Sequence, residues 1–256
     1  MPLLAIDVGN THAKFGVFDG PTLVADWRAV TDHERTADEW AVLLDRFLAL
    51  RGLRLADLTG CIIASVVPVV TAPLGEMVGK YLRVKPLLVG PDIDVGIALE
   101  RVSPYEVGAD RLMNALAARD RYGAPAVVID FGTSTNFDVV SPSGAYIGGA
   151  IAPGLQLSAD ALFQRAARLF KVELVFPPAA IGHSTVTAMQ SGLLWGYVGL
   201  VDGIARRIVA ELSQPATVIG TGGLAEILAP QSEMIQVVDQ GLTVYGLYRL
   251  WELNQS

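Results

Sequence analysis

Short polar residues follow an apolar run near the start of the chain, in the segment IDVGNTHAKFG (residues 6–16). The apolar run predicts a buried strand, and Asp7 is the first charged residue at its end. Gly9 lets the backbone turn, and Asn10 and Thr11 offer short hydrogen-bonding groups. Alone, this pattern is typical of a β-hairpin turn. The same residue types also suit a phosphate, which glycine-rich turns bind through backbone N–H groups and hydroxyls.

A second copy of the pattern occurs in VIDFGTSTNFDVVSPSGAYIGG (128–149). Asp130 and Gly132 match Asp7 and Gly9 at a single offset, and short polar residues follow both glycines. Each copy then returns along an alternating strand to an Asp-Gly or Ser-Gly turn. We therefore expect two related hairpins; chance similarity of a short segment is the alternative.

Strand and helix patterns alternate around both hairpins. We expect a helix over 37–50, a strand over 60–68, a helix over 72–82, a strand over 86–90, a helix from about 108 and a late strand over 217–223. A mixed sheet flanked by helices, formed twice, is an α/β architecture.

The boundary between the two halves is expected within 119–126. A helix ends there at Gly123, and Pro125 prevents its continuation. This gives an N-terminal domain over 1–121 and a C-terminal domain over 122–256. Ligands of open α/β sheets bind beyond strand ends, so we expect the two Asp-x-Gly turns to face one cleft.

The charge balance argues against nucleic-acid binding. The 256-residue chain has a net charge of −7 and no basic stretch that could neutralise successive phosphates. A small anion remains a suitable ligand, because a few local donors can bind one on an acidic protein.

The chain is 52% apolar, with a mean hydropathy of +0.43, so membrane spans were considered. The most apolar region, 191–212, is interrupted by Asp202 and Arg206, which leaves it short of the ~20 residues that a span needs. One face of this predicted helix collects glycines, at positions 192, 196, 199 and 203. We expect a buried helix that a neighbouring backbone approaches closely, and no membrane contact.

The N-terminal residues show neither a basic leader nor an apolar signal segment. The single cysteine, Cys61, lies in the apolar run CIIASVV (61–67) and is expected in the core. Both features favour a cytoplasmic protein.

Five motifs occur in order along the chain: DVGNT (7–11), GADR (108–111), DFGTST (130–135), GGAIAPG (148–154) and GTGGLA (220–225). In this set and order the chain resembles the type III pantothenate kinases, which belong to the acetate kinase/sugar kinase/Hsp70/actin superfamily. The resemblance implies two RNase H-like (actin-like) domains with the active-site cleft between them. It also implies ATP-dependent phosphorylation of the primary hydroxyl of pantothenate, the first step of coenzyme A biosynthesis.

Phosphoryl transfer needs positioning and charge neutralisation, which glycines, hydroxyls and cations supply. The expected ATP-binding residues are Asp7, Val8, Gly9, Asn10, Thr11, His12, Ala13 and Lys14 in the first turn, and Gly132, Thr133 and Thr135 in the second. Lys14 as an ordinary exposed strand lysine is the alternative. The GTGGLA turn would let adenine or ribose approach the backbone, although a plain strand-to-helix turn explains it nearly as well.

Cations are expected at both aspartates. Asp7 would repel a polyphosphate directly, so we expect Mg²⁺ between them, held by Asp7 through water. The resemblance implies a monovalent cation, K⁺ or NH₄⁺, at Asp130; the spacing alone does not separate this from a second magnesium site.

The GADR segment begins a predicted helix. An aspartate in a first helical turn often only favours the helix dipole. The resemblance instead implies that Asp110 is the general base and that Gly108, Ala109, Asp110 and Arg111 contact pantothenate. It further implies a homodimer in which Thr185 reaches pantothenate in the partner subunit. From the residues alone, Ser184 or Thr185 is a helix cap, and His183 lacks the neighbours that a metal site requires.

The sequence departs from the family pattern in two segments. Asn136 stands where a second threonine is usual, and asparagine still donates and accepts hydrogen bonds. Arg101 and Ser103 stand in a segment where an aromatic contact to the acceptor is expected, with Tyr105 nearby. The acceptor site is therefore less securely defined than the nucleotide site.

Two other functions fit the same fold. A noncatalytic regulator, like the transcriptional accessory proteins related to this family, would tolerate degraded phosphate residues, yet Asp7, Asp110 and Asp130 are all present. A polyphosphate or nucleotide phosphatase would release phosphate without an acceptor. Neither explains GADR as well as a kinase does.

Overall fold

The computed structural model describes residues 2–90, 93–103, 106–165 and 169–255. The chain forms two compact units. The first unit contains residues 1–97, 102–117 and 241–256, and the second contains 98–101 and 118–240. The division differs from the boundary expected after residue 121, chiefly because the C-terminal helix belongs to the first unit.

The first unit contains a five-stranded mixed sheet in the order β3-β2-β1-β4-β5. Strands β1 (Pro2–Val8), β2 (His12–Asp19) and β3 (Thr22–Val30) are antiparallel neighbours. Strands β4 (Gly60–Ser65) and β5 (Leu87–Leu88) extend the sheet in parallel from β1. The apolar run before Asp7 is therefore the central strand, as its burial pattern requires.

The second unit repeats this topology in the order β8-β7-β6-β9-β10. Strands β6 (Ala126–Phe131), β7 (Ser134–Val140) and β8 (Tyr146–Pro153) are antiparallel, and β9 (Thr217–Gly222) and β10 (Val237–Val238) add in parallel. The same strand order with the same directions confirms the two hairpins and the twofold α/β architecture predicted from the sequence.

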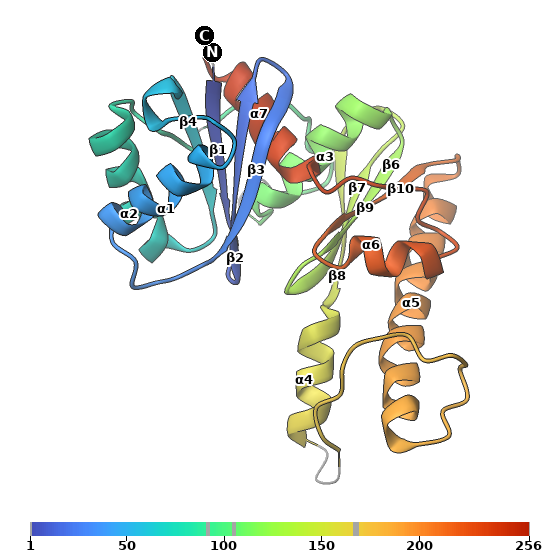
Figure 1. Ribbon diagram of the computed structural model, residues 1–256. Coiled ribbons are helices and arrows are strands. Elements are labelled where there is room, and N and C mark those ends of the chain that lie inside the picture. Colours follow the sequence, from blue (N-terminus) through green and yellow to red (C-terminus); the bar gives the residue numbers. More distant parts are fainter. Residues whose placement is uncertain (1, 91–92, 104–105, 166–168, 256) are drawn as a thin grey trace. The chain divides into compact units, whose positions relative to one another are not determined.

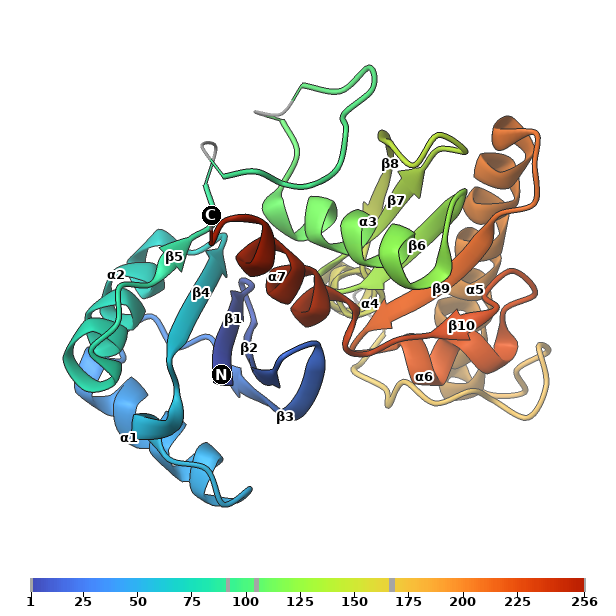
Figure 2. The same ribbon diagram turned by 90° about the horizontal axis from the view of Figure 1, so that it is seen from above.

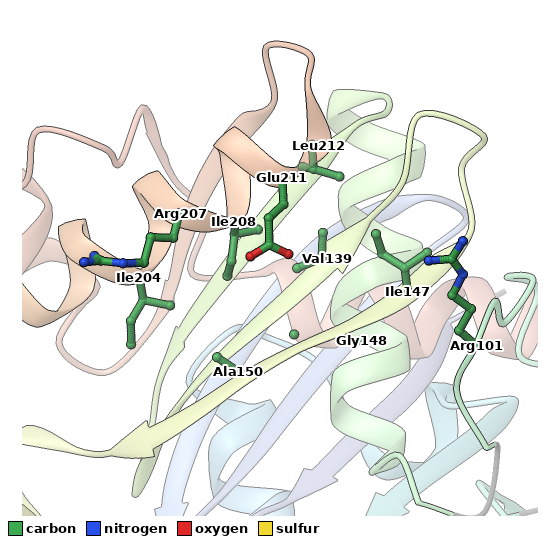
Figure 3. A pocket seen from close by; sticks show the side chains of 11 residues that line it. Arg101, Val139, Ile147, Gly148, Ala150, Ile204, Arg207, Ile208, Glu211 and Leu212 are labelled. Carbon is green, nitrogen blue, oxygen red and sulfur yellow. The ribbon is translucent and has the colours of Figure 1, made fainter.

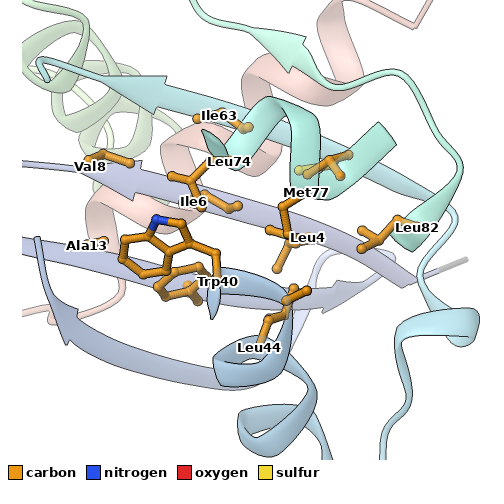
Figure 4. Packing of buried hydrophobic residues seen from close by; sticks show 14 of the residues in the cluster. Leu4, Ile6, Val8, Ala13, Trp40, Leu44, Ile63, Leu74, Met77 and Leu82 are labelled. Carbon is orange, nitrogen blue, oxygen red and sulfur yellow. The ribbon is translucent and has the colours of Figure 1, made fainter. Parts of the chain in front are cut away.

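One face of the first sheet is covered by α1 (Ala37–Ala49), α2 (Pro68–Met77) and the π-helical turn Val78–Leu82. Figure 4 shows Trp40 and Leu44 of α1 and Leu74 and Met77 of α2 packed against Leu4, Ile6 and Ile63 of the strands. Helix α1 begins with a capping box between Thr36 and Glu39. Cys61 is fully buried, and burial raises the pKa of its thiol.

The other face of the first sheet is covered by α3 (Ala109–Tyr122) and α7 (Leu242–Leu253), which lie side by side in Figure 2. Met113 and Leu116 of α3 share a buried cluster with Leu3 and Ala5 of β1. Gly246 of α7 lies so close to the Met113 carbonyl that a side chain there would overlap it. This face carries the start of α3, where the GADR segment lies.

Element boundaries differ from the expected ones around residue 66. The strand expected over 60–68 ends at Ser65, and the helix expected from residue 72 begins at Pro68. Proline is favoured in the first helical turn, where its missing N–H needs no partner. The remaining short helices of the described residues are Leu55–Asp57, α6 (Ala225–Leu228) and Ala229–Gln231.

In the second unit α4 (Leu155–Arg165) lies beside α5 (Thr185–Leu212), as Figure 1 shows. One side of α5 packs on the sheet through Leu194, Tyr197, Val201 and Ala205. The glycine-bearing face was expected to be buried, but Gly192, Gly196 and Gly199 are exposed and no atom of the described chain lies within 4 Å of where their Cβ would be. Among the described residues, no helix has the length and hydropathy required to cross a membrane.

Candidate active site

The first turn connects β1 to β2 through Gly9, Asn10 and Thr11. The Gly9 N–H donates to the His12 carbonyl at 3.0 Å and closes the turn. Thr31 braces it from outside: its N–H donates to the Thr11 carbonyl at 2.9 Å, and its hydroxyl donates to the Gly9 carbonyl at 2.6 Å. Asn10 and Thr11 are exposed, so this braced turn presents polar groups at the surface of the first unit.

The strand register places three charged residues in one row beside this turn. Asp7 of β1 lies directly opposite Lys14 of β2, and Lys14 lies opposite Arg28 of β3. Directly opposed residues project to the same face of a sheet, so all three side chains share a face. This is the face covered by α3 and α7. Leu3, Ala5 and Asp7 stand at every second position of β1 and so share a face, and Leu3 and Ala5 pack against these helices.

The basic side chains act on one another. The pKa of His12 is lowered by partial burial and by the positive charges of Arg28 and Lys14. Lys14 and Arg28 therefore lie close enough to His12 to disfavour its protonation. The predicted ATP-binding segment from Asp7 to Lys14 is thus a turn whose return strand is positively charged.

The second turn connects β6 to β7 through only Gly132 and Thr133. The Gly132 N–H donates to the Ser134 carbonyl at 3.0 Å. Its outer side is held by glycines of two other segments: the Gly154 N–H donates to the Thr133 carbonyl at 3.1 Å, and the Gly223 N–H donates to the Phe131 carbonyl at 3.1 Å. These contacts explain why the GGAIAPG and GTGGLA motifs accompany DFGTST.

The row beside the second turn is neutral except for its aspartate. Asp130 lies opposite Asn136 of β7 and beside Thr221 of β9. The Asn136 side-chain oxygen accepts from the Ser134 hydroxyl at 3.0 Å, which leaves its amide nitrogen as a donor. Asn136 therefore occupies the position that Lys14 has in the first unit.

Thr135 lies beneath the turn. It is fully buried, and its hydroxyl is hydrogen-bonded to the Tyr197 hydroxyl of α5. Burial raises the pKa of Tyr197. Gly132 and Thr133 are the exposed members of the predicted set, while Thr135 fixes the turn to the helix below.

The GADR segment lies at the start of α3 in the first unit. The Gly108 carbonyl accepts from the Arg111 N–H at 3.1 Å, and Asp110 and Arg111 are half-buried. A Cβ at residue 108 would overlap the Asp110 Oδ1 atom, so glycine makes room for that carboxylate. A helix N-terminus favours the ionised carboxylate, which is the form that accepts a proton.

Thr185 is the first residue of α5 and is exposed, while Ser184 is the cap: its hydroxyl accepts from the Thr187 N–H at 3.2 Å. The cap is therefore Ser184, the first of the two expected candidates. Thr185 lines a cavity of about 470 Å³ with Leu162, Met189 and Leu193. The cavity lies between the residues of α4 and α5, within the second unit.

Arg101 lines a second cavity, of about 550 Å³, in the same unit. Figure 3 shows apolar side chains of β7, β8 and α5 around it, with the Glu211 carboxylate directed inward and Arg207 directed away. The Arg207 guanidinium instead donates to the Gly203 carbonyl at 2.7 Å. Arg101 and the 148–150 segment of the GGAIAPG motif thus meet at one cavity. Tyr105 lies outside the described residues.

The described residues hold no group of three or more histidine, cysteine, aspartate or glutamate side chains suited to a metal ion. Two oxygen-bearing side chains that could bind a cation lie side by side at Asp130. The neighbouring Thr221 hydroxyl is fully buried and has no hydrogen-bond partner in the described chain. Carboxylate and hydroxyl oxygens are ligands for hard cations, so these two residues fit such an ion.

Sequence reasoning missed three of the residues described above: Arg28, Thr31 and Thr221. Arg28 and Thr31 lie on or beside β3, and only the register of that strand brings them to the first turn. Thr221 lies inside the GTGGLA motif, but its position beside Asp130 depends on the parallel pairing of β6 and β9.

Two mixed sheets of identical order, each with an aspartate and a glycine turn on its central hairpin, define a class of duplicated α/β proteins. Solved structures share the fold. A conserved protein of the Baf family of transcriptional activators from Campylobacter jejuni aligns with a TM-score of 0.58 at 18% identity, covering 98% of both chains. The ROK hexokinase from Thermus thermophilus aligns with a TM-score of 0.53 at 17% identity, covering 100% of both chains.

Sequence comparisons are more specific. The family model of type III pantothenate kinase matches residues 3–207. The type III pantothenate kinase of Roseiflexus castenholzii is 48% identical over 254 residues, which is 99% of this chain and 100% of that protein. That of Moorella thermoacetica is 47% identical over 252 residues, covering 98% and 99%. The chain belongs to the type III pantothenate kinase family.

Proposed function

We propose that the protein transfers the terminal phosphoryl group of ATP to the primary hydroxyl of pantothenate and forms 4′-phosphopantothenate. The observation that carries this proposal is the Asp110 carboxylate, placed over Gly108 at the N-terminus of α3 on the same sheet face as Asp7 and Lys14. A phosphate turn and an adjacent ionised carboxylate are the groups that transfer to an alcohol requires.

In this mechanism each turn serves as a phosphate-binding element. Backbone N–H groups of the two turns and the hydroxyls of Thr11 and Thr133 bind phosphate oxygens, and Lys14 adds a positive charge. Asp110 accepts the proton of the pantothenate hydroxyl as its oxygen attacks the γ-phosphorus. The bond from that phosphorus to the bridging oxygen breaks, and ADP leaves. Arg111 orients the anionic acceptor or neutralises the moving phosphoryl group.

The residues present fit two cations. Asp7 is a carboxylate at a strand end facing the phosphate site, which suits Mg²⁺ held through water. Asp130 with the buried Thr221 hydroxyl suits a monovalent cation, K⁺ or NH₄⁺. Bound there, the cations would neutralise charge on the nucleotide phosphates.

We further propose that the protein is a cytoplasmic homodimer that joins through α5. Gly192, Gly196 and Gly199 form an exposed face along which a second copy's backbone could approach closely. Exposed apolar residues lie on the adjoining segments, including Phe170, Ile181 and Val186. Exposed apolar side chains near such a face are what an interaction site would require. Thr185, at the start of this helix, would then contact pantothenate bound in the partner subunit.

A coupled ADP-release assay tests the function, run with and without pantothenate and with Na⁺ replacing K⁺. We expect ADP release to require pantothenate and to fall in Na⁺. Release of equal size without any acceptor would indicate a phosphatase instead. Asp110→Asn should lower kcat by about 100-fold or more with an unchanged melting curve, because general-base catalysis typically contributes a factor of this size. Wild-type turnover in this variant would contradict the base assignment.

A further inference from the structure

Arg28 is a positively charged residue beside the first turn that none of the five motifs contains. It lies on β3, the edge strand of the first sheet, directly opposite Lys14. Its neighbour Trp27 points to the opposite face, where its ring stacks on Phe47 of α1 at 5.7 Å. Arg28 therefore projects to the face that carries Asp7 and Lys14.

The charged groups of Lys14 and Arg28 have no partner among the described residues. Neither the Lys14 ammonium nor the Arg28 guanidinium forms a hydrogen bond or an ion pair with a residue in the described ranges. Some basic side chains elsewhere are paired, as Arg54 is with Asp57 at 2.8 Å and Arg121 with Asp239 at 2.7 Å. Two acidic residues lie on the same face nearby. Asp7 is opposite Lys14, and Asp26 is two residues before Arg28 on β3.

This arrangement is unfavourable in the ligand-free sheet. Like charges directly opposite each other on neighbouring strands destabilise the pairing. The pKa of His12 is lowered first by partial burial and then by the positive charges of Arg28 and Lys14, so both basic side chains act on this end of the sheet. A polyanion bound at the turn would remove the repulsion and provide both side chains with acceptors.

We propose that Arg28 binds the phosphate chain of the nucleotide together with Lys14. The inference rests on the proposed function and adds a phosphate-binding residue to it. Lys14 supplies a point charge, whereas the planar guanidinium of Arg28 can donate two parallel hydrogen bonds to one phosphate. Arg28 thus extends the nucleotide site from the central hairpin to the edge strand.

The test measures binding and stability in Arg28→Gln, with Arg51→Gln as the matched control. Arg51 is an exposed residue just after α1, the helix that packs on the opposite sheet face, so its substitution removes the same charge away from the turn. The probes are MgATP, inorganic tripolyphosphate and adenosine. A charge-assisted hydrogen bond is typically worth a factor of about ten or more in affinity.

We expect Arg28→Gln to weaken MgATP and tripolyphosphate binding about tenfold, with adenosine binding and the KM for pantothenate unchanged. Arg28→Lys should recover part of the loss. Without ligand, Arg28→Gln should melt at the same temperature as wild type or higher, because a like-charge pair is relieved.

Two results would overturn the inference: equal tripolyphosphate affinity in Arg28→Gln and Arg51→Gln, or a raised KM for pantothenate with an unchanged KM for ATP. The failure of the proposed function is distinguishable from both. In that case the wild-type protein itself would show neither MgATP binding nor pantothenate-dependent ADP release.

Discussion

The two hairpin turns share a topology but differ in length and charge. The first has three residues between its strands and is flanked by Lys14 and Arg28. The second has two, and the position opposite its aspartate holds Asn136 in place of a lysine. One turn is therefore suited to neutralise an anion with side-chain cations. The other offers oxygens and backbone donors, with no basic side chain opposite its aspartate.

Substitution of the two aspartates should reveal the largest functional difference between the turns. Asp7→Asn is expected to lower kcat about 100-fold or more and to raise the magnesium concentration needed for activity, because a fixed charge stabiliser of the transition state is lost. Asp130→Asn should instead abolish the difference between K⁺ and Na⁺. Steady-state assays over a range of each cation measure both effects. If both variants lost their response to the same ion, the two aspartates would not serve different cations.

A methyl group at the glycines should affect the turns unequally. A Cβ at Gly154 would overlap the Thr133 carbonyl oxygen, whereas a Cβ at Gly9 would lie 3.3 Å from the His12 carbonyl oxygen. Gly154→Ala is therefore expected to destabilise the protein by about 1–3 kcal/mol, the usual cost of overpacking. Gly9→Ala should cost less. Urea denaturation compares the two variants, and equal losses would show that the second turn has room to relax.

The support beneath the second turn should give a smaller effect. Thr135→Val leaves the Tyr197 hydroxyl without its buried side-chain partner, and such a loss costs about 1–3 kcal/mol. Tyr197→Phe removes the other side of the same bond. If the bond fixes the turn, each variant should raise the KM for ATP without changing the KM for pantothenate. A double variant close to either single one in stability would confirm that both act through this bond.

The smallest effect is the pH dependence of the first turn. The pKa of His12 is lowered from 6.5, so the unfolded chain binds the proton more readily than the folded protein does. The free energy of unfolding should therefore decrease as the pH falls below about 6.5, because protonation then favours the unfolded chain. A bound polyanion should raise the His12 pKa again. NMR titration of the imidazole with and without tripolyphosphate measures the change, and an unchanged pKa would argue against phosphate at this turn.

Features coded by local sequence could be predicted. Asp-x-Gly followed by alternating residues predicted both hairpins, and the periodic segment over 37–50 predicted α1. The resemblance added roles for Asp110 and the turn residues, and these roles stay predictions. The glycine face of α5 was misread because the spacing shows only that a close approach is sterically allowed. It does not show which chain makes that approach.

Features that depend on pairing between distant segments could not be predicted. Arg28 reaches the side of the first turn only through the register of β3, which no turn motif fixes. The buried Thr221 hydroxyl becomes a neighbour of Asp130 only when β9 pairs with β6, some ninety positions away in sequence. The packing of α7 on the first sheet joins residues 241–253 to a strand at the other end of the chain.

The return of α7 also sets an order of events during synthesis. Val244, Leu247 and Tyr248 complete the apolar cluster over Leu3 and Ala5, and Trp251 fills the space beside Gly60. The sheet that is translated first therefore keeps the part of this face that α7 covers open until the second unit has emerged. A nascent chain stalled before residue 241 would be recognised by chaperones through that face, and release of α7 would end the recognition.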